Sequence, residues 1–222
     1  MMRVLVACET SGIVRGAFER AGATAWSCDL LPADPGHTDP TRHLQCDAFE
    51  AIECGVRWDL LIVHPPCTYL TSSAEWCYRD VQTKRCTPGV LYGAARRAAR
   101  EDALAFVRRL LAVDVPRICI ENPVGAIGTR IRKADQYVQP YEFGDDASKR
   151  TGLWLRNLPL LVAPPGAAVA GRIVEHNGKR AVRFANQTDS GQNRLAPSAN
   201  RWQLRSKTYP GIANAMAAQW SK

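Results

Sequence analysis

The sequence lacks an apolar run long enough to cross a membrane, since no window reaches the roughly 18 apolar residues that a spanning helix requires. It also lacks a charged start followed by a long apolar stretch and a small-residue cleavage site, the pattern of a secretory signal peptide. We therefore expect a soluble, cytoplasmic protein with no membrane partner.

Metal and disulfide signatures are also scarce. The eight cysteines are scattered, no two are spaced as Cys-x-x-Cys, and the four histidines lie far apart. We expect no metal site and no disulfide scaffold, and we interpret Cys28, Cys46 and Cys119 as small buried hydrophobic residues.

The composition is that of a folded protein with a basic charge. The 222 residues suit one domain with a full core, and 46% of them are hydrophobic. The net charge of +8 favours a polyanionic partner, because clustered Lys and Arg gain affinity by releasing counterions from phosphates. Many basic proteins bind no nucleic acid, so the charge becomes informative only beside the chemistry of a site.

Strand and helix patterns alternate along the chain. Apolar, β-rich runs predict strands at 3–7, 24–28, 60–63, 117–120 and 152–155, and helical periodicity follows at 13–21 and 94–113. The arginines of the second helix are interpreted as solvent-facing: Arg97, Arg100, Arg108 and Arg109. The alternation predicts an α/β fold with a doubly wound, Rossmann-like sheet, whose ligands bind beyond the carboxyl ends of the strands.

The alternation of predicted strands and helices ends at about Pro164. Pro164-Pro165-Gly166 predicts a linker, and a hairpin is predicted over 172–184 around Asn177-Gly178, the pair favoured in type I′ turns. A last helix is predicted near Pro210, with Ile212, Met216 and Trp220 on one face. The stretch 71–93 shows no clear period, and loops of that size are usually functional or mobile.

Chemically active side chains follow two of the predicted strands. His64-Pro65-Pro66-Cys67 comes after the apolar run 60–63, and Glu121-Asn122-Pro123 comes after the next strand. A lone cysteine at such a place is more often structural, but an acid after an apolar run is costly to bury without a partner. Cys67 and Glu121 at adjacent strand ends therefore predict a reaction centre.

These segments resemble the cytosine-5 DNA methyltransferases. That family carries a Pro-Pro-Cys segment with an aromatic residue and a Ser two and four residues later, matched here by Pro65-Pro66-Cys67, Tyr69 and Thr71. Its Glu-Asn-Val segment matches 121–123, and its first loop matches 8–12. The similarity covers roughly residues 3–155. The chain differs from the family in three ways: it has Thr68 where the family has Gln, its first loop has fewer glycines, and it lacks the large target-recognition domain.

The resemblance implies a Rossmann-like, S-adenosylmethionine-dependent methyltransferase fold with a small C-terminal appendage. Residues 1–163 would form the catalytic domain, and 164–222 would supply a hairpin, a loop region and a C-terminal helix that could pack on it and contact DNA. A compact enzyme of this kind would suit a phage or prophage.

The resemblance also implies a reaction. Cys67 would add to carbon 6 of cytosine in DNA while Glu121 hydrogen-bonds or protonates nitrogen 3, and carbon 5 would then take the methyl group of S-adenosylmethionine. Arg150 would help to hold the base, which must be flipped out of a duplex. The cofactor-binding residues would be Glu9, Thr10, Ser11, Gly12, Asp29, Asp47 and Pro66. Nucleic-acid contacts are expected from Thr71, Arg172, Lys179, Arg180 and Arg183.

Three alternatives are weighed against this function. An amino-methyltransferase would use Asp, Asn or Ser before Pro-Pro, where this chain has His64, and Cys67 also argues against it. A related pyrimidine-modifying enzyme could act on RNA or a nucleotide, or use another one-carbon donor. A non-catalytic DNA-binding relative is the third. The target sequence, the strandedness of the substrate and the oligomeric state stay open.

Overall fold

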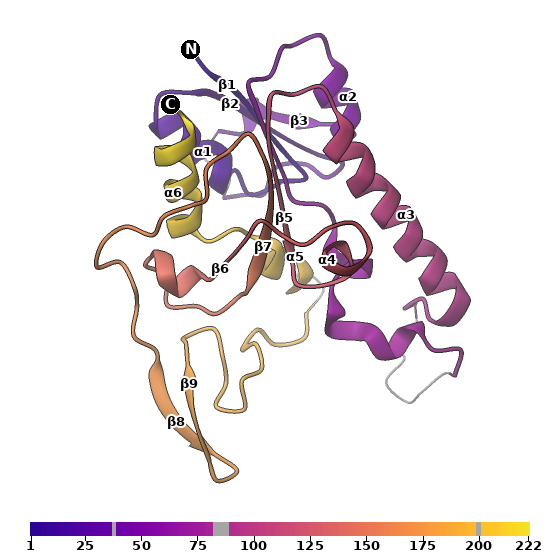
Figure 1. Cartoon of the computed structure of the whole chain (residues 1–222), viewed down its shortest axis with the longest axis vertical. Helices are drawn as coiled ribbons and strands as arrows, with labels where there is room; N and C mark the ends of the chain where they lie inside the picture. Colours follow the sequence, from indigo (N-terminus) through magenta and orange to yellow (C-terminus); the bar gives the residue numbers. More distant parts are fainter. Residues whose placement is uncertain (37–38, 82–88, 199–200) are drawn as a thin grey trace.

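The computed structural model describes residues 1–36, 39–81, 89–198 and 201–222, and a seven-stranded sheet forms its centre (Figure 1). Its strands are β1 (Arg3–Ala7), β2 (Thr24–Asp29), β3 (His43–Gln45), β4 (Leu60–Val63), β5 (Arg117–Pro123), β6 (Gln136–Val138) and β7 (Thr151–Arg156). Their order is β3-β2-β1-β4-β5-β7-β6, with β7 antiparallel to both its neighbours and the other pairs parallel. The order reverses between β1 and β4.

Helices cover both faces of this sheet, which Figure 1 shows clearly. One face packs on α1 (Ile13–Arg20) and α6 (Pro210–Trp220), and the other on α2 (Ala48–Glu53), α3 (Gly93–Ala112) and α4 (Ala126–Arg130). Successive strand residues point to opposite faces, so Val4 and Val6 join the first core while Leu5 and Ala7 join the second. The predicted doubly wound α/β fold is confirmed.

The predicted hairpin and last helix are also present. Strands β8 (Arg172–His176) and β9 (Lys179–Arg183) are joined by Asn177 and Gly178, both with positive φ, as a type I′ turn requires. The hairpin projects from the body of the molecule (Figure 1). Helix α6 buries its predicted apolar face in the core that contains α1. The domain boundary near residue 164 stays a prediction.

Shorter elements lie between these. They are the helix α5 (Arg201–Ser206) and the 3-10 segments Pro40–Arg42, Cys67–Tyr69, Ser72–Tyr78 and Pro140–Phe143. Part of the irregular stretch predicted over 71–93 is thus helical, and its residues 82–88 lie outside the described residues. None of the described helices is both long and apolar enough to cross a membrane.

Candidate active site

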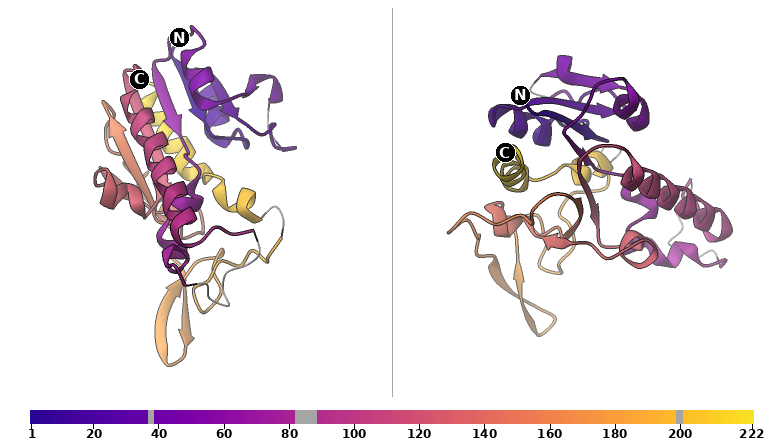
Figure 2. Two further views of the ribbon diagram at one scale, coloured as in Figure 1. Left: turned by 90° about the vertical axis from the view of Figure 1, so that its right-hand side faces the viewer. Right: turned by 45° about the horizontal axis from the view of Figure 1, so that its top comes forward.

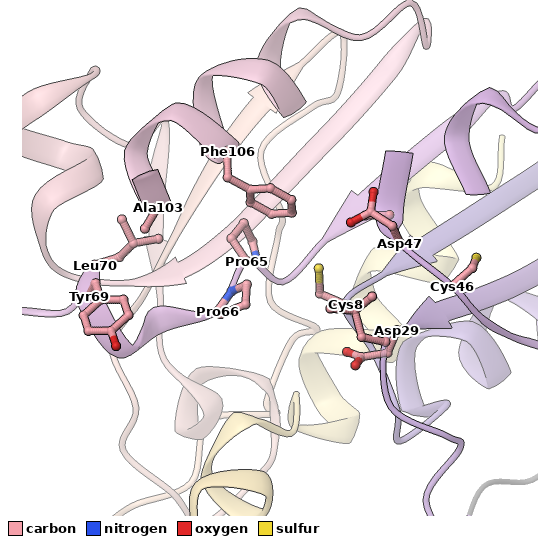
Figure 3. Close-up of a pocket in the computed structure, with 12 residues that line it drawn as sticks. Cys8, Asp29, Cys46, Asp47, Pro65, Pro66, Tyr69, Leu70, Ala103 and Phe106 are labelled. Atoms are coloured by element: carbon pink, nitrogen blue, oxygen red, sulfur yellow. The ribbon is translucent and has the colours of Figure 1, made fainter. Parts of the chain in front are cut away.

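A cavity of about 210 Å³ lies beyond the carboxyl ends of β1, β2 and β4, where the strand order reverses. This is the place where open α/β sheets bind their ligands. Figure 3 shows Asp29 and Asp47 on one side of it, and Pro65, Pro66 and Phe106 on the other. The remaining lining residues are Cys8, Leu30, Cys46, Ala48, Tyr69, Leu70 and Ala103.

The two acids of the cavity are fixed by local backbone geometry. Asp29 ends β2, and its Oδ1 accepts the N–H of Leu31 at 2.9 Å. Asp47 caps the start of α2, where its Oδ1 accepts the N–H of Phe49 at 2.8 Å. Each carboxylate is therefore oriented before a ligand arrives. Cys46 is only half-buried on the cavity wall, so its interpretation as a buried core residue is wrong, whereas Cys28 and Cys119 are buried.

The loop after β1 serves the start of α1. The buried Glu9 carboxylate accepts the N–H groups of Val14 at 2.7 Å and Arg15 at 3.2 Å, and also the Ser11 hydroxyl at 3.3 Å. Gly12 caps the helix with φ of 66°, a conformation that favours glycine. The lining residues of the cavity include Cys8 but not 9–12. The cofactor role expected for Glu9, Thr10, Ser11 and Gly12 stays a prediction.

Cys67 opens the 3-10 turn that follows β4, directly after the cavity residue Pro66. Burial raises the pKa of its thiol, and the negative charge of Glu121 raises it further. The positive charges of Lys149, which has the larger effect, and of Arg205 lower it. The net pKa stays above its usual range, so the resting sulfur carries a proton at neutral pH. Deprotonation must accompany any attack by Cys67, because the thiolate is the nucleophile.

Glu121 lies in the buried part of β5 and contacts His64, which directly follows β4. The Glu121 Oε2 lies 2.8 Å from His64 Nδ1, and both side chains are nearly inaccessible to solvent. Burial by itself would raise the pKa of Glu121, but the charge of Lys149 and hydrogen bonds from His64 and Thr151 hold it below its usual range. The resting acid is therefore a carboxylate. Asn122 adds a tie between the strands by donating to the Pro65 carbonyl at 2.7 Å.

Lys149 is the cation whose charge acts most strongly on both Cys67 and Glu121. Its Nζ also donates to the carbonyls of Ser206 at 3.3 Å and Lys207 at 3.2 Å. The sequence prediction chose the neighbouring Arg150 instead. That side chain is exposed, and its guanidinium lies 4.5 Å from the centre of the Tyr137 ring on the edge strand β6.

Arginines of α3 hold the turn that carries Cys67. Arg96 is buried and donates to the Thr68 carbonyl at 3.1 Å, and Arg100 donates to the Tyr69 carbonyl at 3.0 Å. Arg100 also pairs with Glu75 and is only 11% exposed, so its interpretation as a solvent-facing charge is wrong. These contacts fix the backbone of the two residues that follow Cys67.

Thr71 lies where the loops after β4 and β5 touch. It caps the 3-10 segment Ser72–Tyr78 by accepting the Ser73 N–H, and it forms a β-bridge with Gly125. A Cβ on Gly125 would lie 1.9 Å from the Leu70 carbonyl oxygen, which leaves room for glycine alone. The close approach connects the turn that contains Cys67 with the loop that follows Glu121.

The hairpin divides its four basic residues into two pairs. Arg172 pairs with Asp189 and donates to the Gln187 carbonyl at 2.9 Å, and Arg183 donates to the Asp189 carbonyl at 3.2 Å. These two attach the root of the hairpin to the following loop. Lys179 and Arg180 lie exposed beside the projecting turn.

Sequence reasoning missed His64 and Lys149. His64 stands beside the recognised Pro-Pro-Cys segment, so its place next to a strand end was visible. The direction of the Lys149 side chain could not be predicted, because nothing in the sequence Lys149-Arg150 tells which of the two side chains turns toward β5.

Comparisons with known proteins give only a distant likeness. No protein-family model matches the chain, and no curated protein matches it. A solved structure described as a DNA modification methyltransferase encoded within a prophage (E. coli) is 14% identical, with a TM-score of 0.44 over 70% of this chain and 46% of that chain. The Dnmt2 methyltransferase of S. pombe is 18% identical, with a TM-score of 0.41 over 73% and 51%. A DNMT2 mutant of Spodoptera frugiperda is 13% identical, with a TM-score of 0.39 over 72% and 52%. The chain spans about half the length of these three structures.

Proposed function

We propose that this chain is an S-adenosylmethionine-dependent methyltransferase that acts on carbon 5 of cytosine in DNA, with Cys67 as the nucleophile. One observation carries the proposal. Cys67 directly after β4 and Glu121 in the neighbouring strand β5 lie on the same side of the sheet as a cavity at the point where the strand order reverses.

The cavity suits the adenosine part of the cofactor. Asp29 follows β2, the place from which α/β folds present an acid to ribose hydroxyls, and its carboxylate is already oriented. Pro65 and Phe106 offer an apolar wall for the adenine ring, and Asp47 offers an acceptor for a polar group. When bound, the cofactor supplies a methyl group on a positively charged sulfur. Pro66 would then separate the cofactor from the target base.

A single proton, passed from Cys67 through Glu121, would serve the addition of sulfur to cytosine. In the resting site the proton lies on sulfur and the carboxylate is ionised. As sulfur bonds to carbon 6, its proton would reach ring nitrogen 3 through Glu121, and the C5–C6 π electrons would make carbon 5 nucleophilic. Once carbon 5 carries the methyl group, it loses its own proton to solvent. Expulsion of sulfur returns the nitrogen 3 proton through Glu121 to Cys67.

Neighbouring residues would set the positions of these groups. His64 would hold the Glu121 carboxylate in position through its Oε2. Lys149 would stabilise the thiolate as it forms, since its charge already opposes the rise in the pKa of Cys67. Arg150, expected from the sequence to hold the base, would have to leave Tyr137 to do so.

DNA is proposed as the substrate from charge and shape. The net charge is +8, and Lys179 and Arg180 stand at the end of a projecting two-stranded ribbon. A ribbon of this kind fits the major groove, where its basic side chains reach phosphates. Arg172 and Arg183 would act indirectly by fixing the ribbon, and Thr71 would contact the strand near the target base.

The first experiment measures methyl transfer directly. The full chain and a Cys67→Ser variant are incubated with S-adenosylmethionine labelled in its methyl group and with DNA, RNA or dCMP, and the products are digested to nucleosides. We expect labelled 5-methylcytosine from DNA with the parent chain and none with the variant. Label from RNA or dCMP alone would overturn the DNA substrate, and no label from any of the three would overturn the methyltransferase.

A further inference from the structure

A short helix next to the candidate site presents an aromatic and a basic side chain to solvent. We propose that α5 is a nucleobase-stacking element, in which Trp202 stacks on an unstacked base of the DNA strand and Arg205 contacts its backbone. The proposal depends on the proposed DNA substrate and adds a surface outside the cavity, the Cys67–Glu121 pair and the hairpin. Figure 2 shows α5 as the short helix that precedes α6 in the chain.

The inner side of α5 is attached to the protein from two directions. Gln203 donates to Asp34 at 2.9 Å, and Lys207 pairs with the same buried carboxyl group at 2.8 Å. From the other direction, Lys149 donates to the carbonyls of Ser206 and Lys207. A cation at the last carbonyls of a helix is also favourable for the helix dipole. The helix is thus anchored to the loop after β2 and to the lysine beside Cys67.

The outer side carries the proposed contacts. Trp202 is 59% exposed, and Arg205, three residues later, falls on the same side of the helix. The charge of Arg205 lowers the pKa of Cys67, so this side of α5 lies within electrostatic reach of the nucleophile. Leu204 is 44% exposed but two residues from Trp202, which turns it to a different side.

Nucleic acid is the partner that this combination fits. Aromatic side chains stack on the flat faces of bases with little regard to sequence, and such stacking contributes about 5- to 100-fold in affinity per base. An arginine one turn away supplies a phosphate contact in a chain that is already strongly basic. A base that must leave the duplex to reach Cys67 leaves its neighbours unstacked, and Trp202 would cover one of them.

Measuring DNA affinity at several salt concentrations separates the stacking contribution of Trp202 from the charge contribution of Arg205. The full chain, Trp202→Ala, Trp202→Phe, Arg205→Ala and the matched control Leu204→Ala are titrated with a fluorescein-labelled DNA duplex at several salt concentrations, by anisotropy. We expect Trp202→Ala to weaken binding about 5- to 100-fold at every salt concentration with an unchanged slope of log affinity against log salt. Trp202→Phe keeps most of the affinity, Arg205→Ala lowers the slope by about one, and Leu204→Ala changes neither.

The outcomes distinguish this surface from the proposed reaction, because binding requires no turnover. Parent-like affinity of Trp202→Ala, while the parent chain binds DNA, would overturn the stacking surface and leave the methyltransferase standing. Equal losses in Trp202→Phe and Trp202→Ala would also overturn it, since a smaller aromatic ring still stacks. If the parent chain methylates RNA and binds no DNA, both the DNA substrate and this surface are overturned.

Discussion

Lys149 acts on two groups that hold opposite protonation states. Its charge lowers the pKa of both Cys67 and Glu121, so it favours the thiolate and the carboxylate at once. The thiol nevertheless stays protonated at rest, since burial has the larger effect on Cys67. The balance between sulfur and carboxylate therefore depends on a lysine that the sequence did not distinguish from its arginine neighbour.

Replacing Lys149 by Met should raise the pKa of the Cys67 thiol further, because the opposing positive charge is lost while burial remains. Alkylation of Cys67 by iodoacetamide, followed by peptide mass mapping from pH 7 to 10, measures this change. We expect the alkylation curve to move to higher pH, and methyl transfer at neutral pH to fall. Arg150→Met is the matched control, expected to leave the curve in place. An equal movement in the two variants would contradict the assignment to Lys149.

His64 is expected to position Glu121 through the single hydrogen bond at its Nδ1. His64→Ala removes this bond and should raise the pKa of Glu121, with a loss of about 10- to 100-fold in kcat and little change in KM for DNA. His64→Asn places an amide donor near the same point and should recover most of the loss. Steady-state kinetics check both variants. An Asn variant as slow as the Ala variant would show that the hydrogen bond is not what His64 contributes.

At the scale of elements, the site depends on the contact between the loops after β4 and β5. The Ala126 N–H donates to the Leu70 carbonyl, and Ser72 donates to the Val124 carbonyl at 3.3 Å. Together with the bridge between Thr71 and Gly125, these bonds make one unit of two loops that are about fifty residues apart in the chain. The relative position of Cys67 and Glu121 follows from this unit.

Gly125→Ala should separate the two loops, because the new methyl group would overlap the Leu70 carbonyl. We expect a loss of about 1–3 kcal/mol in the free energy of unfolding and a larger fractional loss of activity than of stability. Denaturant unfolding and a turnover assay measure the two effects. Gly55→Ala is a control for adding a methyl group to an exposed glycine with open space around it, although its positive φ adds some strain of its own. Full activity in Gly125→Ala would contradict the coupling of the loops.

The elements that the sequence predicted are those with enough length or apolar character to be distinctive. Strand β4 is a continuous apolar run, and the hairpin turn Asn177-Gly178 has a strong local preference. By contrast, β3 and β6 have three residues each and α4 has five, which is too short for a period to be counted. Their places are fixed by partners distant in sequence: β6, for example, exists because β7 pairs with it.

The site could likewise be predicted only where local sequence patterns indicate it. Cys67 and Glu121 were found because strand ends meet at one edge of a parallel sheet. Arg100 was interpreted as a surface charge because its partners lie in irregular segments: Tyr69 is in the turn after β4, and Glu75 is in the stretch 71–93. Contacts of that kind are made by tertiary packing and leave no mark in local periodicity.

At the scale of the whole molecule, the ionised Glu121 should make stability depend on pH. Its pKa is lowered in the folded state, so its contribution is present above the ordinary glutamate value of about 4.3 and is lost as the pH falls through the lowered value. Glu121→Gln should therefore lower the Tm near pH 7, and the difference from the parent chain should shrink toward pH 3. Thermal unfolding from pH 3 to 7 measures this difference.

The exposed Glu53, replaced by Gln, is the control for that series and should give a small difference at every pH. A gap between the parent chain and Glu121→Gln that widens on acidification would mean that the folded protein holds Glu121 protonated. The resting proton would then lie on the carboxylate, and the direction of transfer proposed for the first step would be reversed.

The packing of α6 against α1 has a consequence for the order in which the protein is made. Ile212, Met216 and Trp220 fill one face of the sheet together with Val14 and Phe18, so that face stays open until α6 has left the ribosome. The opposite face can close earlier, since all its helices precede residue 131. A growing chain would therefore expose one apolar face of the sheet until α6 emerges, and partly folded chains with such a face exposed are prone to aggregate.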